Sequence, residues 1–389
     1  MIDSLHTGIR EHPELGVGSA TEGIEVRSVG NTQKLQESFL IEAFNLKAAI
    51  EFKTDQIDSA RESLTDMPPR SEQELDAVTL HNQALINFDL DPAESFEKLQ
   101  FLLQRHEGAF PPETFANLLI LYCRYEYFEL AADLMAENTQ FTYKYLTQYV
   151  YEFLDGLITA QTSPEEGYRK FEELLIRSGE VLRRLHKQLQ EVKGQADRTI
   201  EAATVANVSG TLRDVQTEID QQMQSYIPLL MAQAKIYWDL ENYEQVEKVF
   251  YKSVDFCSDH DTWKLNVAHT LFMQVSQVAC ARMKSDSNNK SDQSQENKDE
   301  EATGFYEQLV KKNYDNILNV SAIVLANLCV SYIMLGQNQP AEDLMRKIER
   351  EEEQLLMSEP ERRVYHLCIV NLVIGTLYCS KGERPASRE

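Results

Sequence analysis

A short side chain that returns every 35 or 36 residues constrains the fold of this chain more than any other feature. Its four occurrences are Ala60, Ser95, Ala131 and Gly167. A period of this length marks a repeat protein, in which each unit packs against its neighbours and together they bury a continuous core. A chain of 389 residues can then form one elongated array in place of two or three separate domains.

Three segments add an aromatic side chain nine residues before the short one. The pairs are Tyr122 and Ala131, Tyr237 and Val246, and Tyr332 and Ala341. An earlier unit fits with Ala48 and Ala60, although Glu51 stands in place of the aromatic. A large residue late in a first helix (helix A) and a short one early in a second (helix B) allow close packing, which is the tetratricopeptide spacing. We therefore predict an all-α fold, a tetratricopeptide-repeat superhelical solenoid.

A heptad pattern interrupts the repeat over residues 168–224. Apolar residues alternate at spacings of four and three over 171–192 and again over 208–219, with a break at 194–197. Such a pattern is the seam of two helices packed side by side. We predict an inserted, coiled-coil-like helical hairpin over 168–224. One stretched repeat with two long helices is the alternative.

The remaining chain divides around this hairpin. We predict tetratricopeptide repeats over 38–167, 225–274 and 301–382, after an N-terminal segment over 1–37 that holds a partial repeat. Residues 275–300 are predicted to be a disordered loop, because the stretch from Lys284 to Glu301 contains no apolar side chain. Residues 383–389 are predicted to be a disordered tail, which leaves the last helix A without its helix B.

The formal net charge of −25 bears on the choice of partner. Nucleic acids and anionic membranes repel such a chain unless a local basic patch intervenes, and we expect no such patch because lysines and arginines are scattered among acids. The six cysteines form no Cys-x-x-Cys pair, which suits a reducing, intracellular compartment. We find no signal peptide, and the longest apolar runs fall short of the roughly 20 residues that a bilayer requires.

No residue is a convincing candidate for catalysis or metal binding. Asp259, His260 and Asp261 place two carboxylates beside an imidazole, but neighbours in a turn do not converge on one point. The chain contains no His-Glu-x-x-His motif, phosphate loop or Gly-x-Ser-x-Gly elbow. We therefore predict that the protein is not an enzyme and uses no metal or cofactor.

Asparagine recurs at the sixth position of helix A, counted with the short helix-A side chain as the eighth. The four residues are Asn82, Asn117, Asn266 and Asn327. Asparagine is unfavourable inside a helix, yet its carboxamide can both donate to and accept from the backbone of an extended peptide. We predict that the four form a peptide-binding ladder on the concave face, where pockets are lined by Ile120, Arg124, Val330 and Met334. The alternative is that these amides bond within or between helices.

Longer strings of residues resemble one family specifically. They include Asp66-Met-Pro-Pro-Arg70, Thr79-Leu-His-Asn-Gln-Ala-Leu85 and Phe110-Pro-Pro-Glu-Thr-Phe115, with further matches at 96–104, 239–243, 318–332 and 365–375. In these strings the chain resembles the tetratricopeptide-repeat subunit of intraflagellar transport complex B, the fleer or tetratricopeptide repeat protein 30 family. The resemblance runs from Glu22 to Gly382 outside the 275–300 loop.

The resemblance implies a subunit of the ciliary cargo train. Members of that family form a tight superhelix around a proline-rich segment of a neighbouring complex B subunit, and are needed for cilium assembly, anterograde transport and axonemal tubulin polyglutamylation. It also implies other complex B subunits and kinesin-associated cargo as partners, and a location at the axoneme and ciliary base with a cytoplasmic pool. Against the family pattern, the chain looks truncated at both ends.

A cytosolic cochaperone-like module that captures acidic peptide tails is the alternative function. That function requires lysine or arginine on several helix-A faces to pair with carboxylates. Arg124 is almost the only such residue, and the net charge of −25 opposes acidic ligands. We therefore favour a non-enzymatic adaptor that binds an extended partner segment in its concave groove.

Overall fold

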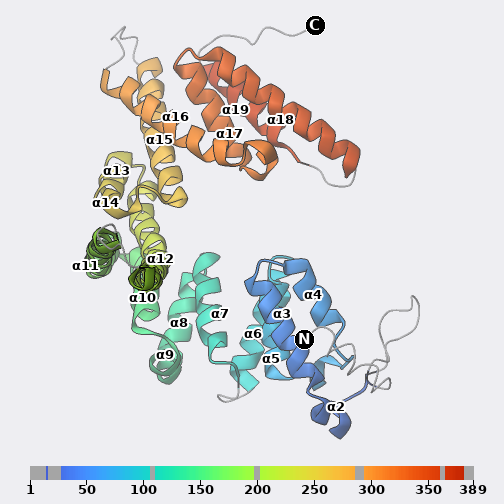
Figure 1. Ribbon diagram of the computed structural model, residues 1–389. Coiled ribbons are helices and arrows are strands. Elements are labelled where there is room, and N and C mark those ends of the chain that lie inside the picture. The colour runs from blue at the N-terminus through green and yellow to red at the C-terminus, as the bar shows by residue number, and fades with distance from the viewer. Residues whose placement is uncertain are drawn as a thin grey trace. The chain divides into compact units, whose positions relative to one another are not determined.

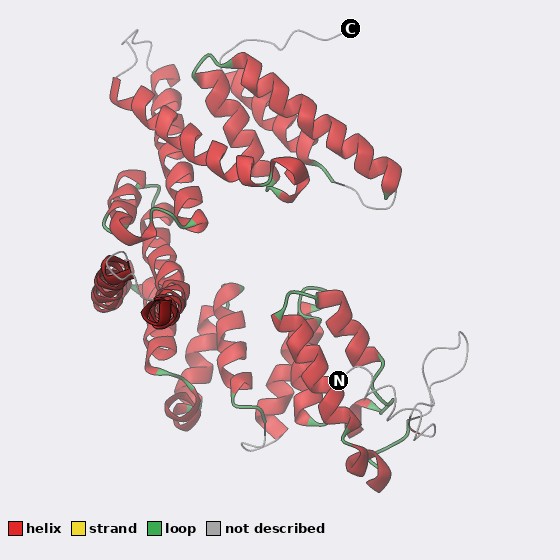
Figure 2. Ribbon diagram, in the orientation of Figure 1, coloured by secondary structure: helices red, strands yellow, loops and turns green. Residues whose placement is uncertain are grey.

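Every secondary-structure element described in the computed structural model is a helix (Figure 2). The structure describes residue 15 and residues 28–105, 110–196, 202–284, 293–359 and 364–380. Contacts divide the chain into two compact units, Met1–Gln161 and Thr162–Glu389. The prediction of an all-α repeat fold is confirmed, because most helices lie in successive helix–turn–helix pairs.

The first unit contains three such pairs, α3 with α4, α5 with α6, and α7 with α8 (Figure 1). Its elements are α2 (Gln33–Ser38), α3 (Leu40–Lys53), α4 (Ile57–Thr65), η2 (Glu72–Glu74), α5 (Ala77–Ile86), α6 (Pro92–Arg105), α7 (Glu113–Arg124), α8 (Phe128–Glu137), α9 (Thr139–Tyr145) and α10 (Gln148–Thr162). The largest apolar core of this unit joins α5 to α10, with Phe115, Leu99 and Leu102 fully buried at its centre.

The second unit begins with two long helices and continues with further pairs. Its elements are α11 (Pro164–Ala196), α12 (Ala202–Asp239), α13 (Tyr243–Tyr251), α14 (Val254–Cys257), α15 (Asp261–Lys284), α16 (Gln293–Lys312), η3 (Tyr314–Asn319), α17 (Ala322–Met334), α18 (Asn338–Ser358) and α19 (His366–Ser380). A second core joins α15 to α19 around Tyr306, Leu325 and Ile348.

Four of the turns between helix A and helix B share one backbone motif. In each turn, the N–H of the residue that precedes helix B donates to the carbonyl five positions earlier in the chain. The pairs are Gln56 to Glu51, Tyr127 to Tyr122, Asn242 to Tyr237, and Gln337 to Tyr332. The residue directly before the donor has positive φ in every case: Asp55, Glu126, Glu241 and Gly336. This is the Schellman helix end, which satisfies the last carbonyls of helix A.

The short side chains that set the sequence period are buried where helix B begins. Ala60, Ser95, Ala131 and Gly167 are all buried, and Ala60 and Ala131 have no exposed surface. Ala341 lies in the same place at the start of α18 and is 3% exposed. At Ala60, Ala131 and Ala341 a longer side chain has no space, so the period reflects packing between the two helices of a pair.

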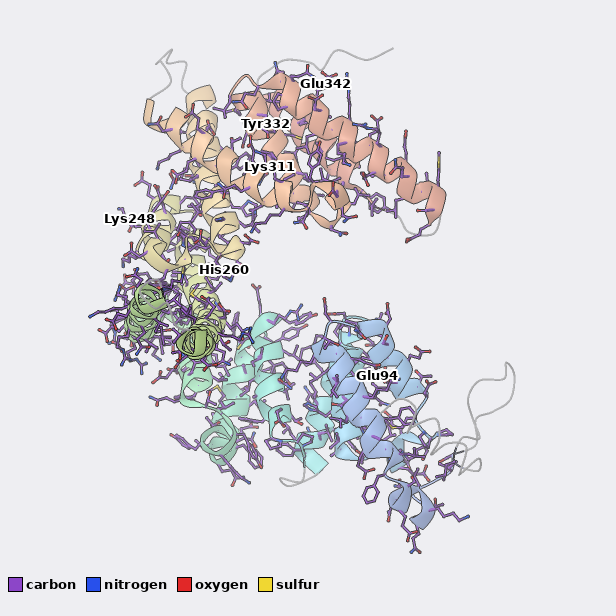
Figure 3. All side chains as sticks on the ribbon, viewed as in Figure 1. Glu94, Lys248, His260, Lys311, Tyr332 and Glu342 are labelled. Atoms are coloured by element: carbon purple, nitrogen blue, oxygen red, sulfur yellow. The ribbon has the colours of Figure 1, made fainter. Side chains whose placement is uncertain are left out.

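The aromatic residues late in helix A reach back to the preceding repeat. The hydroxyl of Tyr122 in α7 accepts a bond of 2.6 Å from Gln100 in α6. Tyr332 in α17, labelled in Figure 3, donates across 2.9 Å to Glu307 in α16. These residues therefore join successive repeats in addition to filling the space within a pair.

The heptad segment forms the two long helices α11 and α12, of 33 and 38 residues, packed along each other. Their seam is apolar and buried: Phe171, Leu175, Leu182, Leu185, Ile219 and Met223. α12 runs on through Pro228 into helix A of the next repeat and ends at Asp239. Residues 226, 227, 229 and 230 around the proline are buried, and this packing offsets the hydrogen bond that Pro228 cannot make. Two long helices in which the second continues into helix A of the next repeat are the arrangement of the stretched-repeat alternative, and the boundaries 168–224 of an inserted hairpin stay a prediction.

Helix replaces much of the loop predicted over 275–300. α15 continues to Lys284 and α16 begins at Gln293, while residues 285–292 lie outside the described residues. The start of α16 is held by Lys298, whose Nζ lies 2.8 Å from an oxygen of Glu247 in α13. Composition alone could not reveal this anchor, because its acceptor lies about fifty positions earlier in the chain. The predicted tail over 383–389 also lies outside the described residues.

Candidate functional site

The helix-A asparagines of the first unit join successive repeats through side-chain hydrogen bonds. Asn82 in α5 donates across 2.9 Å to Oδ1 of Asn45 in α3, and the Asn45 amide donates across 2.9 Å to Thr79 Oγ1. One buried residue of α3 thus contacts two positions of α5 that lie three apart. We call this arrangement the inter-repeat clasp.

The same clasp recurs one repeat later with histidine in place of asparagine. His81 in α5 lies 2.8 Å from Thr114 Oγ1 through Nδ1, and 3.5 Å from the Asn117 amide through Nε2. The contacts are consistent with a neutral ring that donates from Nδ1 and accepts at Nε2. Burial lowers the pKa of His81, an effect that nearby Glu113 partly offsets.

The second unit uses a related contact at one of its two asparagines. Asn327 in α17 donates across 3.2 Å to the Tyr306 hydroxyl and lies 3.3 Å from His269 Nδ1 in α15. Asn266 differs, because its amide donates across 2.8 Å to Thr262 in its own helix. The amide nitrogens of all four asparagines therefore bond within or between helices, which was the alternative to a peptide ladder.

The four carboxamides still offer an acceptor each. Among the described residues none donates to Oδ1 of Asn82, Asn117, Asn266 or Asn327, and all four side chains are half-buried. Two of these asparagines lie in each unit. The acceptors available to a ligand therefore form two separate pairs.

The apolar and basic residues predicted beside the asparagines differ in exposure. Ile120 is 44% exposed, and Arg124 is exposed with its guanidinium 6.0 Å from the ring centre of Tyr125. Met334 is half-buried. Val330 is only 5% exposed, which makes it a poor candidate for contact with a peptide.

A groove of about 610 Å³ lies at the first clasp, between α2, α3 and α5. Its lining residues are Asn31, Leu35, Gln36, Ile41, Glu42, Asn45, Leu46, Ala49, Arg70, Asp76, Val78 and Asn82. Leu46 and Val78 are 55% and 47% exposed, so they present apolar surface to solvent. We call this feature the α3–α5 groove, and Asn82 is the predicted ladder residue within it.

Leu46 was missed by the sequence analysis although the signal was present. Counting back two positions from Ala48 places Leu46 at the sixth position of its helix A, equivalent to Asn82. The prediction depended on asparagine at the sixth position, and Leu46 has no carboxamide there. Val78 gave no separate signal, because one exposed valine in a helix is ordinary.

The described residues that line the α3–α5 groove offer no cation to an acidic ligand. Arg70 is the only lysine or arginine among them, and its guanidinium pairs across 3.0 Å with Asp76 while the side chain is 3% exposed. Burial raises the pKa of Asp76, but hydrogen bonds from Thr79 and Arg70 outweigh it and leave the pKa below its ordinary value. Glu42 is exposed at the rim. The groove therefore suits a neutral or basic segment with apolar side chains.

The successive helix pairs and the inter-repeat clasps define a protein of the helical-repeat class. Comparison with known families agrees: residues 114–283 and 293–385 match the family described as "Intraflagellar transport protein 70 C-terminal domain". This match covers more than half of the chain, which belongs to the intraflagellar transport protein 70 family.

Relatives of this family are similar along nearly the whole chain. Intraflagellar transport protein 70A1 of Mus musculus is 60% identical over 98% of this chain and 52% of its own length. Protein 70A of Homo sapiens is 61% identical over 97% of this chain and 52% of its own length. The chain thus spans about half the length of the curated relatives it matches. None of these names is that of an enzyme, in line with the predicted absence of catalysis.

Among solved structures, a monomeric mutant of IFIT1 with Gppp-AAAA is 14% identical and covers 86% of this chain and 77% of that one. The TM-score is 0.32, too low for any argument about this chain.

The described residues also limit other kinds of site. None of their helices combines the length and apolar character needed to cross a bilayer. Within the same residues, no three histidines, cysteines or acids are grouped as metal ligands. His260 accepts a hydrogen bond of 3.3 Å from the Thr262 N–H at the start of α15, and Asp261 pairs with Lys312, so this turn has structural contacts.

Proposed function

We propose that the chain is a non-enzymatic adaptor of the intraflagellar transport B particle and binds an extended segment of a neighbouring subunit along its helix-A face. The α3–α5 groove is the observation that carries the proposal. It combines exposed Leu46 and Val78 with the free acceptor of Asn82. Apolar side chains of a segment would pack on the first two, while its backbone N–H donates to the third.

The charge of the groove separates this proposal from the cochaperone-like alternative. An acidic tail requires unpaired cations, whereas Arg70 is buried against Asp76 and Glu42 adds a negative charge at the rim. Arg124, the exposed cation predicted on a helix-A face, does not line the groove. A proline-rich segment without acids meets the requirement of this surface, because it carries apolar rings and no charge that the groove would repel.

Family membership supports the cellular setting of the proposal. An adaptor of this particle would serve cilium assembly and anterograde transport, act at the axoneme and ciliary base with a cytoplasmic pool, and contribute to axonemal tubulin polyglutamylation. Other complex B subunits are the proposed partners, with kinesin-associated cargo as a further one.

Recovery of particle subunits from extracts of ciliated cells tests the proposal. The full chain is compared with Leu46→Asp/Val78→Asp, which places two charges in the groove. The control is Ile176→Asp/Leu240→Asp, because these residues are similarly exposed, at 53% and 63%, on other surfaces. We expect the chain and the control to recover complex B subunits and the groove variant to recover few. Equal recovery by both variants, or recovery of chaperones alone, contradicts the proposal.

A further inference from the structure

The outer part of α11 is basic in a chain that is otherwise strongly acidic. Residues 181–190 contain Arg183, Arg184 and Lys187 and no aspartate or glutamate. The whole chain has 63 acids against 38 lysines and arginines. Lysines and arginines scattered among acids predicted no basic patch, and this stretch of α11 is an exception to that prediction.

The three cations lie on the solvent side of α11. Arg183 is four residues from Lys187 and Arg184 is three from it, and such spacings place side chains on one helix face. The opposite face is the seam with α12, where Leu182 is fully buried and Leu185 is 5% exposed. All three cations are exposed. We call Arg183, Arg184 and Lys187 the α11 basic face.

No described acid neutralises this face through an ion pair. Glu180 and Glu191 flank it on α11, and Asp214 and Glu218 lie on the partner helix α12, yet none of them is within ion-pair distance of the three cations. Elsewhere in the same helix, Arg169 pairs with both Glu166 and Glu173. The basic face therefore differs from the paired cation nearer the start of the same helix.

We propose that the α11 basic face binds an acidic, extended protein segment. Arginine forks match carboxylates in bidentate geometry, so Arg183 and Arg184 offer two such contacts, and Lys187 adds a third positive charge about one helical turn from Arg183. A short segment experiences mainly the charges of this face, since exposed charges farther away than about 8 Å are largely screened at physiological salt. A membrane or a nucleic acid spans much more of the acidic surface and is repelled by it. This surface is separate from the α3–α5 groove.

Binding of a fluorescein-labelled Glu-Gly repeat peptide to the full chain, measured by fluorescence anisotropy, tests the proposal. We expect saturable binding that weakens as salt rises from about 0.05 M to about 0.2 M. Arg183→Glu/Arg184→Glu/Lys187→Glu should lower the affinity by about fivefold or more. The control Lys235→Glu/Lys248→Glu/Lys311→Glu makes the same charge change at dispersed exposed positions, and should retain most of the binding.

Further arms keep the result interpretable. If circular dichroism shows that the triple glutamate variant does not fold, the triple glutamine variant replaces it and should still weaken binding by about threefold. Leu46→Asp/Val78→Asp should bind the acidic peptide normally, which separates this surface from the proposed function. The proposal is overturned if the dispersed control loses as much affinity, if the basic-face variants lose none, or if phosphatidylserine vesicles or single-stranded DNA bind the face while the peptide does not.

Discussion

The amide of Asn82 in α5 donates a hydrogen bond of 2.9 Å to Oδ1 of Asn45 in α3, and so joins two successive repeats. Asn45 is buried, so Asn82→Ala leaves its oxygen without this donor. We expect the free energy of unfolding to fall by about 1–3 kcal/mol in urea titrations. Asn266→Ala removes a bond within a single helix at a more accessible site, and should cost about 0.5 kcal/mol. Equal losses for the two variants would contradict a joining role for Asn82.

Stability should decrease in mild acid because of His81. Burial lowers its pKa in the folded chain, whereas the unfolded chain takes up the proton near the ordinary value of 6.5. The free energy of unfolding is therefore at its full value above pH 6.5 and falls as the pH drops toward the folded pKa, by at most about 1.4 kcal/mol per pH unit.

The control for this prediction is His81→Asn, since Asn45 occupies the equivalent place in the preceding clasp without titrating. Urea midpoints at pH values on both sides of 6.5 give the comparison. When the pH is lowered from above 6.5 to below it, the wild-type chain should lose more stability than His81→Asn. Parallel losses would show that other groups set the pH dependence.

Glycine should stabilise two of the turns between paired helices. Glu126 and Glu241 have φ of 62° and 55°, a left-handed conformation that Gly336 adopts at the equivalent turn. Because a side chain in this region costs about 1–2 kcal/mol, Glu126→Gly and Glu241→Gly should each raise stability by about 1 kcal/mol. Glu218→Gly within α12 should lower it by about the same amount. Thermal unfolding of the three variants tests the opposite signs.

Lys298 should be required for the start of α16. Its Nζ contacts Glu247 in α13 and Gln274 in α15. Lys298→Met removes a donor from both side chains: Glu247 keeps the bond from the Gln274 amide, whereas Oε1 of Gln274 has no other donor among the described residues. We expect a loss of about 1–2 kcal/mol and faster amide hydrogen exchange near the beginning of α16. Lys311→Met breaks only an exposed pair with Glu307 and should leave this exchange unchanged. Slow exchange in Lys298→Met would argue that apolar packing alone holds the helix start.

The sequence predicted the repeats well because their packing depends on local spacing. Ala131 and Tyr122 are nine positions apart, and both lie in the pair of helices that they define. The start of α16 could not be predicted in this way, since its anchor joins Lys298 to Glu247 in another repeat. The hydrogen bonds of the predicted ladder could not be foreseen for the same reason: the partners of Asn82 and Asn117 lie in the preceding helix A, about 36 positions earlier in the chain.

Photo-crosslinking from the α3–α5 groove tests the central claim most directly. A benzophenone amino acid at Val78 of the full chain is compared with the same probe at Leu90, which is 69% exposed and lies outside the groove. In ciliated cells we expect the Val78 probe to crosslink a subunit of the intraflagellar transport B particle, and Leu46→Asp to abolish the crosslink. No crosslink from Val78, or an equal crosslink from Leu90, would contradict the account.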